Sequence, residues 1–316
     1  MAPAASRVGL LVGMEETFPE PFLDIVTRKG RAHGIQGDMA VLGGTREMDE
    51  AAYAVIVDRI SHEVPYYRAY LKQAVLQGTV AVNDPFWWEA DEKFFECTLA
   101  RRVGVAVPKT VALPNRDYIP DIDRDRSLRN VRDPDWETIA AYTGLPAVMK
   151  PNKGGGNKDI HVCHSVDELV GAYENAGLKT MIVQELIEYD DYVRCICIGR
   201  EHVLPLRYNH RLPRPERYRV NEPVDGRLRE AATRDALKLV QALGYDMDTV
   251  EMAVRDGTLY AIDFLNPAPD FGRESIKEEA FHWVLEHMSD LVIAYARGEK
   301  QPPWRGEHRW WRFVNR

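Results

Sequence analysis

The sequence predicts an α/β fold built from more than one domain, and three observations support this prediction. First, residues 7–84 alternate short β-branched runs ("RVGLLVG", "AVIVDRI", "TVAVND") with a helical segment, "YYRAYLKQAVLQG", that ends at Gly78. Second, residues 145–266 contain several strand-like runs joined by short turns, which is typical of hairpins. Third, 316 residues are more than one hydrophobic core normally holds, so two or three domains are expected.

Composition and charge exclude several classes of protein. Hydrophobic residues at 45% and charged residues at 28% match an ordinary globular protein, and the net charge of −8 argues against nucleic acid as the main partner. Only about five apolar residues precede Glu15 and Glu16, too few for a signal peptide, and no run approaches the ~18 residues of a membrane span. A cytoplasmic protein is therefore expected. The cysteines show no CxxC spacing and are interpreted as reduced core thiols: Cys97, Cys163, Cys195 and Cys197.

The remaining elements follow from apolar spacing and from capping residues. Phe94, Phe95, Leu99 and Val103 predict a helix over residues 88–104 that ends at Gly104. The polar, proline-punctuated residues 114–134 indicate a connection or a surface loop near a domain boundary. Strands are expected over residues 145–150, 159–164, 179–187 and 192–209, a hairpin over 248–266 that turns at residues 256 and 257, and helices over 165–177, 225–244 and 277–295.

A glycine-rich loop between two strands is a candidate anion site. Lys150, Lys153 and Lys158 surround three consecutive glycines within "AVMKPNKGGGNKDIH". The loop has neither the GxxxxGK[ST] spacing of the P-loop nor the GxGxxG spacing of dinucleotide-binding folds. Backbone N–H groups of such a turn can form an anion nest, to which the lysines add charge. The alternative is a flexible exposed hairpin with incidental lysines.

A second constellation combines two acids and an amide in "VEMAVRDGTLYAIDFLNPAPD". Glu251 and Asp263 each lie within an apolar strand, and Asn266 follows Asp263 by three residues. Buried carboxylates need cations or hydrogen bonds. Two carboxylates and an amide oxygen are donors suited to Mg²⁺, which also bridges to phosphates. The alternative is a structural pairing of these acids with nearby arginine or lysine.

With these motifs in place, the chain resembles the ATP-grasp enzymes, closest in layout to glutathione synthetase and the RimK-type glutamate ligases. The resemblance spans roughly Val8 to Tyr295. It implies an α/β (α+β ATP-grasp) fold, in which an N-terminal α/β domain precedes two α+β subdomains that clasp ATP between antiparallel sheets. The implied segments are an N-terminal domain, a small subdomain with the glycine-rich loop, a C-terminal subdomain with the metal site and a tail: 1–106, 107–182, 183–300 and 301–316.

The resemblance assigns roles to residues of the glycine-rich loop and its surroundings. "VNDPFWWEADEKFFECTLARRVGVAVPKT" is similar to the family segment that carries the first nucleotide lysine, here Lys93. Lys150 would be the second nucleotide lysine and would neutralise charge on the α- and β-phosphates. The loop glycines would allow the backbone to fold over the β- and γ-phosphates: Gly154, Gly155 and Gly156.

A further stretch, "VQELIEYDD", is similar to the family's hinge strand. Backbone groups around Glu185 and Leu186 would contact the adenine edge, and either Glu188 or Asp191 would hold the ribose hydroxyls. The resemblance leaves the choice between these two acids open.

Glu251, Asp263 and Asn266 match the family's magnesium ligands in order and approximate spacing. The family usually places its last acid and its asparagine two residues apart, on one face of a strand, whereas "DFLN" separates them by three. A bulge at Phe264 or Leu265 would restore the geometry. Otherwise Asn266 is not a ligand, and the site holds one metal ion rather than two.

Most arginines of "RYNHRLPRPERYRVNEP" are interpreted as a solvated face. "YRVN" nevertheless resembles the family segment that approaches the transferred phosphoryl group, so Arg219 and Asn221 are catalytic candidates. Arg194, upstream on its strand, is a third. A guanidinium can bind a carboxylate or an acyl phosphate through two parallel hydrogen bonds. The basic, aromatic end of the chain, "WRGEHRWWRFVNR", is interpreted as a tail that packs its tryptophans onto the domain.

The implied activity is an ATP-dependent carboxylate–amine ligase that works through an acyl phosphate. The implied cofactors are ATP with Mg²⁺ or Mn²⁺, and the implied partners are a small carboxylic acid and an amine, with no nucleic acid and no membrane. Relatives of this layout are often dimers or tetramers. Two alternatives remain at this point: a kinase of the same fold that phosphorylates a small molecule, and a nucleotide-binding module without catalysis.

Overall fold

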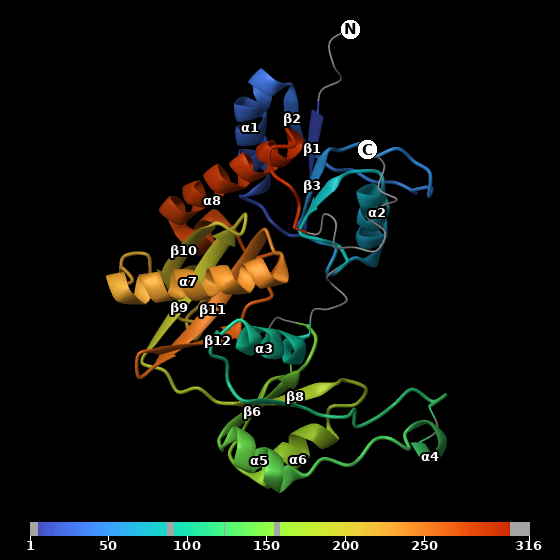
Figure 1. Cartoon of the computed structure of the whole chain (residues 1–316), viewed down its shortest axis with the longest axis vertical. Helices are drawn as coiled ribbons and strands as arrows, with labels where there is room; N and C mark the ends of the chain where they lie inside the picture. The colour runs from blue at the N-terminus through green and yellow to red at the C-terminus, as the bar shows by residue number, and fades with distance from the viewer. Residues whose placement is uncertain (1–5, 87–91, 123, 155–158, 304–316) are drawn as a thin grey trace. The chain divides into compact units, whose positions relative to one another are not determined.

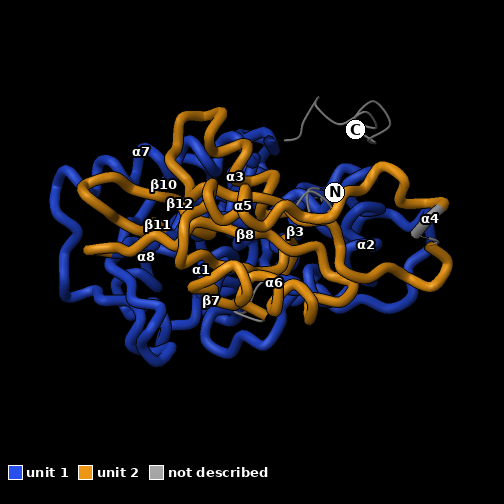
Figure 2. Tube along the Cα trace, turned by 90° about the horizontal axis from the view of Figure 1, so that it is seen from below, with its two compact units in different colours: residues 1–88, 192–251, 264–316 blue, residues 89–191, 252–263 orange. Residues whose placement is uncertain are grey.

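The computed structural model describes residues 6–86, 92–122, 124–154 and 159–303. The chain forms two compact units (Figure 2). Unit 1 contains residues 1–88, 192–251 and 264–316, and unit 2 contains residues 89–191 and 252–263. The two compact units have other limits than the family subdomains predicted from the sequence. The predicted subdomains therefore stay a prediction: 1–106, 107–182 and 183–300. Within the described ranges, every helix is too short or too polar to cross a membrane.

The first sheet of unit 1 is parallel and has the order β2-β1-β3-β4. Val8 of β1 pairs with Gly37 of β2 and with Val55 of β3, which pairs in turn with Val80 of β4. The central strands are almost wholly buried, as in a sheet that is covered on both faces. Its elements are β1 (Ser6–Leu11), α1 (Pro19–Gly30), η1 (Arg31–His33), β2 (Ile35–Met39), β3 (Val55–Asp58), α2 (Pro65–Leu76) and β4 (Val80–Val82).

A second sheet has the order β10-β9-β11-β12. Strands β9 and β10 are antiparallel, with Cys195 opposite Pro205, and α7 lies across them (Figure 1). The turn between β11 and β12 has Asp256 and Gly257 at φ 52° and 73°, which confirms the predicted hairpin. The elements are β9 (Asp191–Ile198), β10 (His202–Arg207), η3 (Arg214–Glu216), α7 (Gly226–Leu243), β11 (Met247–Arg255), β12 (Thr258–Asp263) and α8 (Arg273–Ala296), whose helical conformation is interrupted at Lys277.

Unit 2 holds an antiparallel sheet of order β5-β8-β6-β7. Helices α5 and α6 cover one face, where Met149, Leu169 and Val183 share a core, and α3 lies on the other (Figure 1). The glycine-rich loop joins the antiparallel strands β6 and β7, as predicted. The elements are α3 (Lys93–Arg102), β5 (Thr110–Ala112), α4 (Arg124–Ser127), α5 (Trp136–Thr143), β6 (Ala147–Pro151), β7 (His161–Cys163), α6 (Val166–Glu174) and β8 (Met181–Glu185).

The structure confirms the predicted fold class and several local details. The Ser165 hydroxyl accepts a hydrogen bond from Glu168 N at the start of α6, and Gly104 follows α3 with φ 75°. All four cysteines are free and buried. Residues 114–134 lie within unit 2 and include the short helix α4. Their expected position near a family subdomain boundary stays a prediction.

Asn83 connects the end of β4 to residues of unit 1 that flank the second sheet. Its side chain is 4% exposed and donates to the carbonyl oxygens of Met247 (2.7 Å) and Pro267 (3.3 Å). Its Oδ1 atom accepts hydrogen bonds from the backbone N–H groups of Asp246 (2.8 Å) and Met247 (3.0 Å). A single amide thus satisfies backbone groups at the start of β11 and after β12.

Replacing Asn83 should therefore destabilise unit 1. In Asn83→Ala the buried N–H and C=O groups lose their partners, which should lower the free energy of unfolding by about 2–4 kcal/mol. Thermal and urea unfolding followed by circular dichroism measure the change. Asn175→Ala, which removes an exposed amide bonded to Gly171 O, is the matched control and should have little effect. Equal melting temperatures for the two variants would contradict the role of Asn83.

Candidate nucleotide and metal site

Unit 2 brings Lys93, Lys150 and Gly154 together. The Lys93 ammonium donates to Gly154 O at 2.6 Å, and Lys93 N donates to Asn152 O at 2.9 Å. The Asn152 side chain accepts from Phe94 N at 3.0 Å, so it caps α3 from the strand that enters the loop. The first turn of α3 is thereby fixed beside the start of the glycine-rich loop. A lysine pair and backbone groups at such a turn can bind an anion.

Lys150 is a buried lysine on β6, with 8% of its surface exposed. Burial lowers its pKa below the usual range of lysine, the Asp263 carboxylate opposes this shift, and the nearby Lys93 adds to it. The charge of Lys150 is therefore influenced both by Lys93, the first predicted nucleotide lysine, and by Asp263, a predicted metal ligand. A bound phosphate would offset the cost of keeping this ammonium charged.

Gly154 and Lys153 are the other residues of the glycine-rich loop that the structure describes. Gly154 has φ 92°, a conformation that favours glycine. Lys153 is half-exposed and pairs with Glu92 at 3.2 Å, which favours its interpretation as a solvated lysine. Gly155, Gly156 and Lys158 lie outside the described residues.

The side chain of Glu185, at the end of β8, forms structural contacts within unit 2. Its Oε1 atom accepts from both terminal nitrogens of Arg255 at 3.1 Å, and its Oε2 atom accepts from Lys109 N at 3.2 Å. Any contact with an adenine would therefore come from the backbone, as the sequence analysis predicts for Glu185 and Leu186. Of the two candidate ribose acids, Glu188 is exposed and Asp191 is half-buried, and the choice stays open.

The carboxylate of Glu251 is held from both sides within unit 1. The Tyr192 hydroxyl donates to its Oε2 atom at 2.7 Å, and Arg194 Nη1 lies 3.5 Å from its Oε1 atom. Arg194 also donates to Tyr208 Oη at 3.0 Å and to Thr249 Oγ1 at 2.9 Å. The structural pairing that the sequence left as an alternative is thus present for Glu251.

Asn266 reaches the same cluster. Its Nδ2 atom donates to Thr249 Oγ1 at 3.0 Å, and its backbone N–H donates to Asp248 Oδ1 at 2.8 Å. A bulge within β12 at Phe264 or Leu265, which would restore the family spacing, is ruled out because β12 ends at Asp263 and both residues lie beyond the strand. The spacing argument for a single strand face therefore does not apply to Asn266.

The donor set is compatible with a hard divalent cation. Carboxylate oxygens and an amide oxygen are the ligands that Mg²⁺ accepts, with phosphates completing its shell. Across the ranges that the structure describes, no group of three or more His, Cys, Asp or Glu side chains could hold a metal ion by itself. Glu251 and Asn266 belong to unit 1 and Asp263 belongs to unit 2, so the predicted three-residue metal site stays a prediction.

The two remaining catalytic candidates do not join this cluster. Arg219 is exposed and pairs with Glu222, while its backbone N–H donates to Arg207 O at 2.9 Å. Asn221 is exposed. Arg194, in contrast, is 9% exposed, with its guanidinium over the rings of Tyr208 and Tyr218.

Sequence reasoning missed a polar pair at the carboxyl ends of β1 and β3. Arg59 is 4% exposed, lies over the rings of Phe18 and Phe271, and donates to Glu15 Oε1 at 2.5 Å. The Glu15 Oε2 atom is buried and has no hydrogen-bond partner among the described residues. Strand order reverses between β1 and β3, the place where open α/β sheets bind ligands. The available signal was a charged residue shortly after each of two buried strands, Arg59 immediately after β3 and Glu15 in the loop that follows β1.

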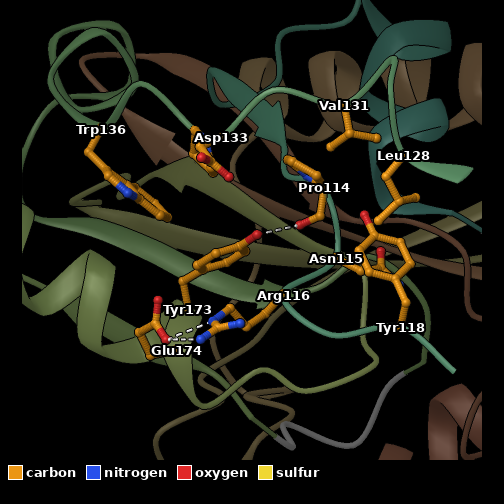
Figure 3. Close-up of a pocket in the computed structure, with 11 residues that line it drawn as sticks. Pro114, Asn115, Arg116, Tyr118, Leu128, Val131, Asp133, Trp136, Tyr173 and Glu174 are labelled. Atoms are coloured by element: carbon orange, nitrogen blue, oxygen red, sulfur yellow. Dashed lines mark hydrogen bonds and ion pairs between the residues drawn. The ribbon is translucent and has the colours of Figure 1, made fainter. Parts of the chain in front are cut away.

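A cavity of about 360 Å³ lies in unit 2 between residues 114–136 and α6 (Figure 3). Trp136 and Tyr173 meet edge to face at 5.1 Å, Tyr173 Oη donates to Pro114 O at 3.1 Å, and Arg116 pairs with Glu174. None of the predicted nucleotide or metal residues lines it. These contacts pack part of the polar stretch against α6.

No family model matches the chain. The D-alanine–D-alanine ligase of Fervidobacterium nodosum is 29% identical over 177 residues, which cover 50% of this chain and 56% of that protein. The chain spans about half the length of the curated D-alanine ligases that it matches first. The RimK domain ATP-grasp protein of Sphaerobacter thermophilus superposes with a TM-score of 0.65 at 16% identity, covering 90% of this chain and 99% of that one. The chain has the ATP-grasp fold.

A second solved ATP-grasp neighbour holds the nucleotide. The D-alanine–D-alanine ligase of Bacillus anthracis, crystallised with ATP, superposes with a TM-score of 0.59 at 15% identity and covers 94% of this chain and 100% of that one. Its likeness supports the fold of the present ATP-grasp chain over nearly its whole length.

The buried Lys150 gives a pH-dependent prediction. Only the protonated ammonium attracts phosphate, so ADP affinity should be highest below the pKa of Lys150 and should fall as the pH rises through it. Because that pKa is lowered, the fall should begin below the ordinary lysine value of about 10.4. Calorimetric titration of ADP between about pH 8 and about pH 10 measures it. Lys150→Arg stays charged and should flatten the profile, whereas identical profiles would contradict the assignment.

Proposed function

We propose that this ATP-grasp protein is an ATP-dependent carboxylate–amine ligase. The observation that carries the proposal is the cluster of Lys93, Lys150 and Gly154 at the glycine-rich loop of an ATP-grasp fold. The first two curated relatives are named D-alanine–D-alanine ligases, and this supports amide formation as the reaction class. Other curated relatives are mitochondrial pyruvate carboxylases, 25–26% identical over 171 residues.

In this proposal Lys93 and Lys150 neutralise the phosphates of ATP, and the backbone of residues 154–156 folds over them. The backbone of Glu185 and Leu186 contacts the adenine, while Glu188 or Asp191 binds the ribose. Positioning and charge neutralisation supply most of the catalysis in phosphoryl transfer, so no nucleophilic side chain is required.

Glu251, Asp263 and Asn266 would hold the divalent cation, Mg²⁺ or Mn²⁺, which neutralises charge on the phosphates when bound. Arg194 lies beside Glu251 and keeps positive charge at this cluster. Arg219 and Asn221 would approach the transferred phosphoryl group only if their exposed segment moves, since Arg219 is paired with Glu222.

The reaction has two balanced steps. An oxygen of the substrate carboxylate attacks the γ-phosphorus, the bond to the β-bridging oxygen breaks, and ADP leaves with that electron pair. The amine nitrogen then attacks the acyl carbon, inorganic phosphate leaves, and the amine loses a proton to form the amide. The polar pair of Glu15 and Arg59, at the carboxyl ends of β1 and β3, is our candidate for binding one of these small substrates.

A hydroxylamine trap tests the reaction class. The protein is incubated with ATP, Mg²⁺, hydroxylamine and pooled amino acids and small carboxylic acids, and hydroxamate and ADP are measured together. Hydroxamate in proportion to ADP is expected. ADP with a phosphorylated product and no hydroxamate would indicate a kinase, and intact ATP would indicate a nucleotide-binding module; either result would overturn the proposal.

Glu251 should be essential for turnover but not for folding. Glu251→Gln keeps an oxygen that can accept the Tyr192 hydrogen bond, yet it removes the charge that a cation requires. ADP release should fall by at least about 100-fold, with a melting temperature close to that of the wild type. Glu174→Gln, which removes an exposed partner of Arg116, is the control and should retain activity. Wild-type ADP release by Glu251→Gln would remove Glu251 from the site.

A further inference from the structure

We propose that Tyr192 is a positioning residue that orients the Glu251 carboxylate for a divalent cation. The inference rests on the proposed function, because it takes Glu251 as a ligand of the cation that accompanies ATP. It adds a residue that neither the family resemblance nor the sequence pattern singles out. Tyr192 reads in the sequence as an ordinary aromatic residue of a strand.

The two oxygens of Glu251 have different partners. Oε2 accepts a 2.7 Å hydrogen bond from the Tyr192 hydroxyl, whereas Oε1 lies 3.5 Å from the Arg194 guanidinium. One carboxylate oxygen thus has a neutral hydroxyl partner and the other has a positively charged partner, which together restrict how the carboxylate can turn. Only about a fifth of the Glu251 side chain is exposed, at 18%. A cation could therefore reach the Glu251 carboxylate only through the small part of the side chain that is exposed.

The Tyr192 hydroxyl is itself held in place by packing. The residue is 6% exposed, and its ring meets the His210 ring edge to face at 5.2 Å and the Tyr208 ring at 6.2 Å. Its carbonyl oxygen accepts from Tyr208 N at 3.0 Å. Tyr192→Phe therefore removes one oxygen atom and leaves the apolar part of the ring able to keep these contacts.

The chemical reason for a neutral partner lies in Arg194. A carboxylate that paired fully with this guanidinium would have to give up a buried ion pair before it could bind a cation. The phenol holds one carboxylate oxygen without adding a competing positive charge, so it keeps Glu251 from turning wholly toward Arg194. Hydrogen bonds of this kind to metal ligands typically contribute about 10–100-fold in metal affinity.

Manganese binding provides a test that does not depend on turnover. Mn²⁺ is titrated into each protein in the presence of the non-hydrolysable analogue AMP-PNP, and free Mn²⁺ is measured by electron paramagnetic resonance. Tyr192→Phe should raise the dissociation constant for Mn²⁺ by about 10-fold or more. Tyr295→Phe is the matched control, because Tyr295 is 4% exposed and donates to the Asp246 carboxylate at 2.5 Å, away from Glu251. Its Mn²⁺ affinity should equal that of the wild type.

Two further variants separate this inference from the proposed function. Glu251→Gln should weaken Mn²⁺ binding, and adding Tyr192→Phe to it should have no further effect, because the two residues act through one carboxylate. If Glu251→Gln binds Mn²⁺ like the wild type, the proposed metal role of Glu251 fails. If Glu251→Gln is impaired but Tyr192→Phe is not, only the positioning role is overturned. Equal weakening in Tyr192→Phe and Tyr295→Phe would indicate a structural effect and would also overturn it.

Discussion

The buried guanidinium of Arg194 is the group on which the polar interior of unit 1 depends. A cation with 9% exposure is costly unless its charge and its N–H groups are satisfied. Two tyrosine rings, the Tyr208 hydroxyl, Thr249 and the Glu251 carboxylate surround it. The Thr249 hydroxyl in turn accepts a hydrogen bond from the Asn266 side chain, so β9, β11 and the loop after β12 are all connected to this one charge.

Unit 2 also contains a buried cation whose charge must be stabilised, Lys150. Lys150 lies on an otherwise apolar strand, and its pKa is lowered because burial outweighs the favourable effect of Asp263. Helix α3 supplies Lys93 and the adjacent loop supplies the Gly154 carbonyl that Lys93 contacts. Keeping Lys150 charged in this buried position is unfavourable, and a bound anion would offset that unfavourable free energy. Residues with perturbed pKa values are for this reason often found at functional sites.

Local rules predicted the parts of this protein that one segment determines by itself. The Asp256-Gly257 turn, the Ser165 cap and the strand-loop-strand arrangement around Gly154 all depend on residues a few positions apart. Several elements were missed. Helix α1 begins within a proline pair, β5 is flanked by prolines, β2 has a polar pattern, and α4 and α5 are short. In each case tertiary packing outweighs weak local propensity.

Some residues of the candidate site could likewise be predicted from local sequence, and others could not. Lys150 and Glu251 could be predicted because a charged residue within an apolar run needs an explanation. The pair of Arg59 and Glu15 was missed, although each residue comes shortly after the end of a buried strand. Tyr192 could not be found, because a tyrosine in a strand requires no special explanation and its role comes from a residue 59 positions away. Asn266 was judged by strand geometry that does not apply, since β12 ends before it.

The central claim is that nucleotide and divalent cation bind together through these residues. The most direct test is the affinity for AMP-PNP, measured by calorimetry with excess Mg²⁺ and again with the metal removed by EDTA. The account predicts that metal removal weakens binding by at least about 10-fold in the wild type and much less in Glu251→Gln. Equal affinities with and without Mg²⁺ in the wild type would contradict it.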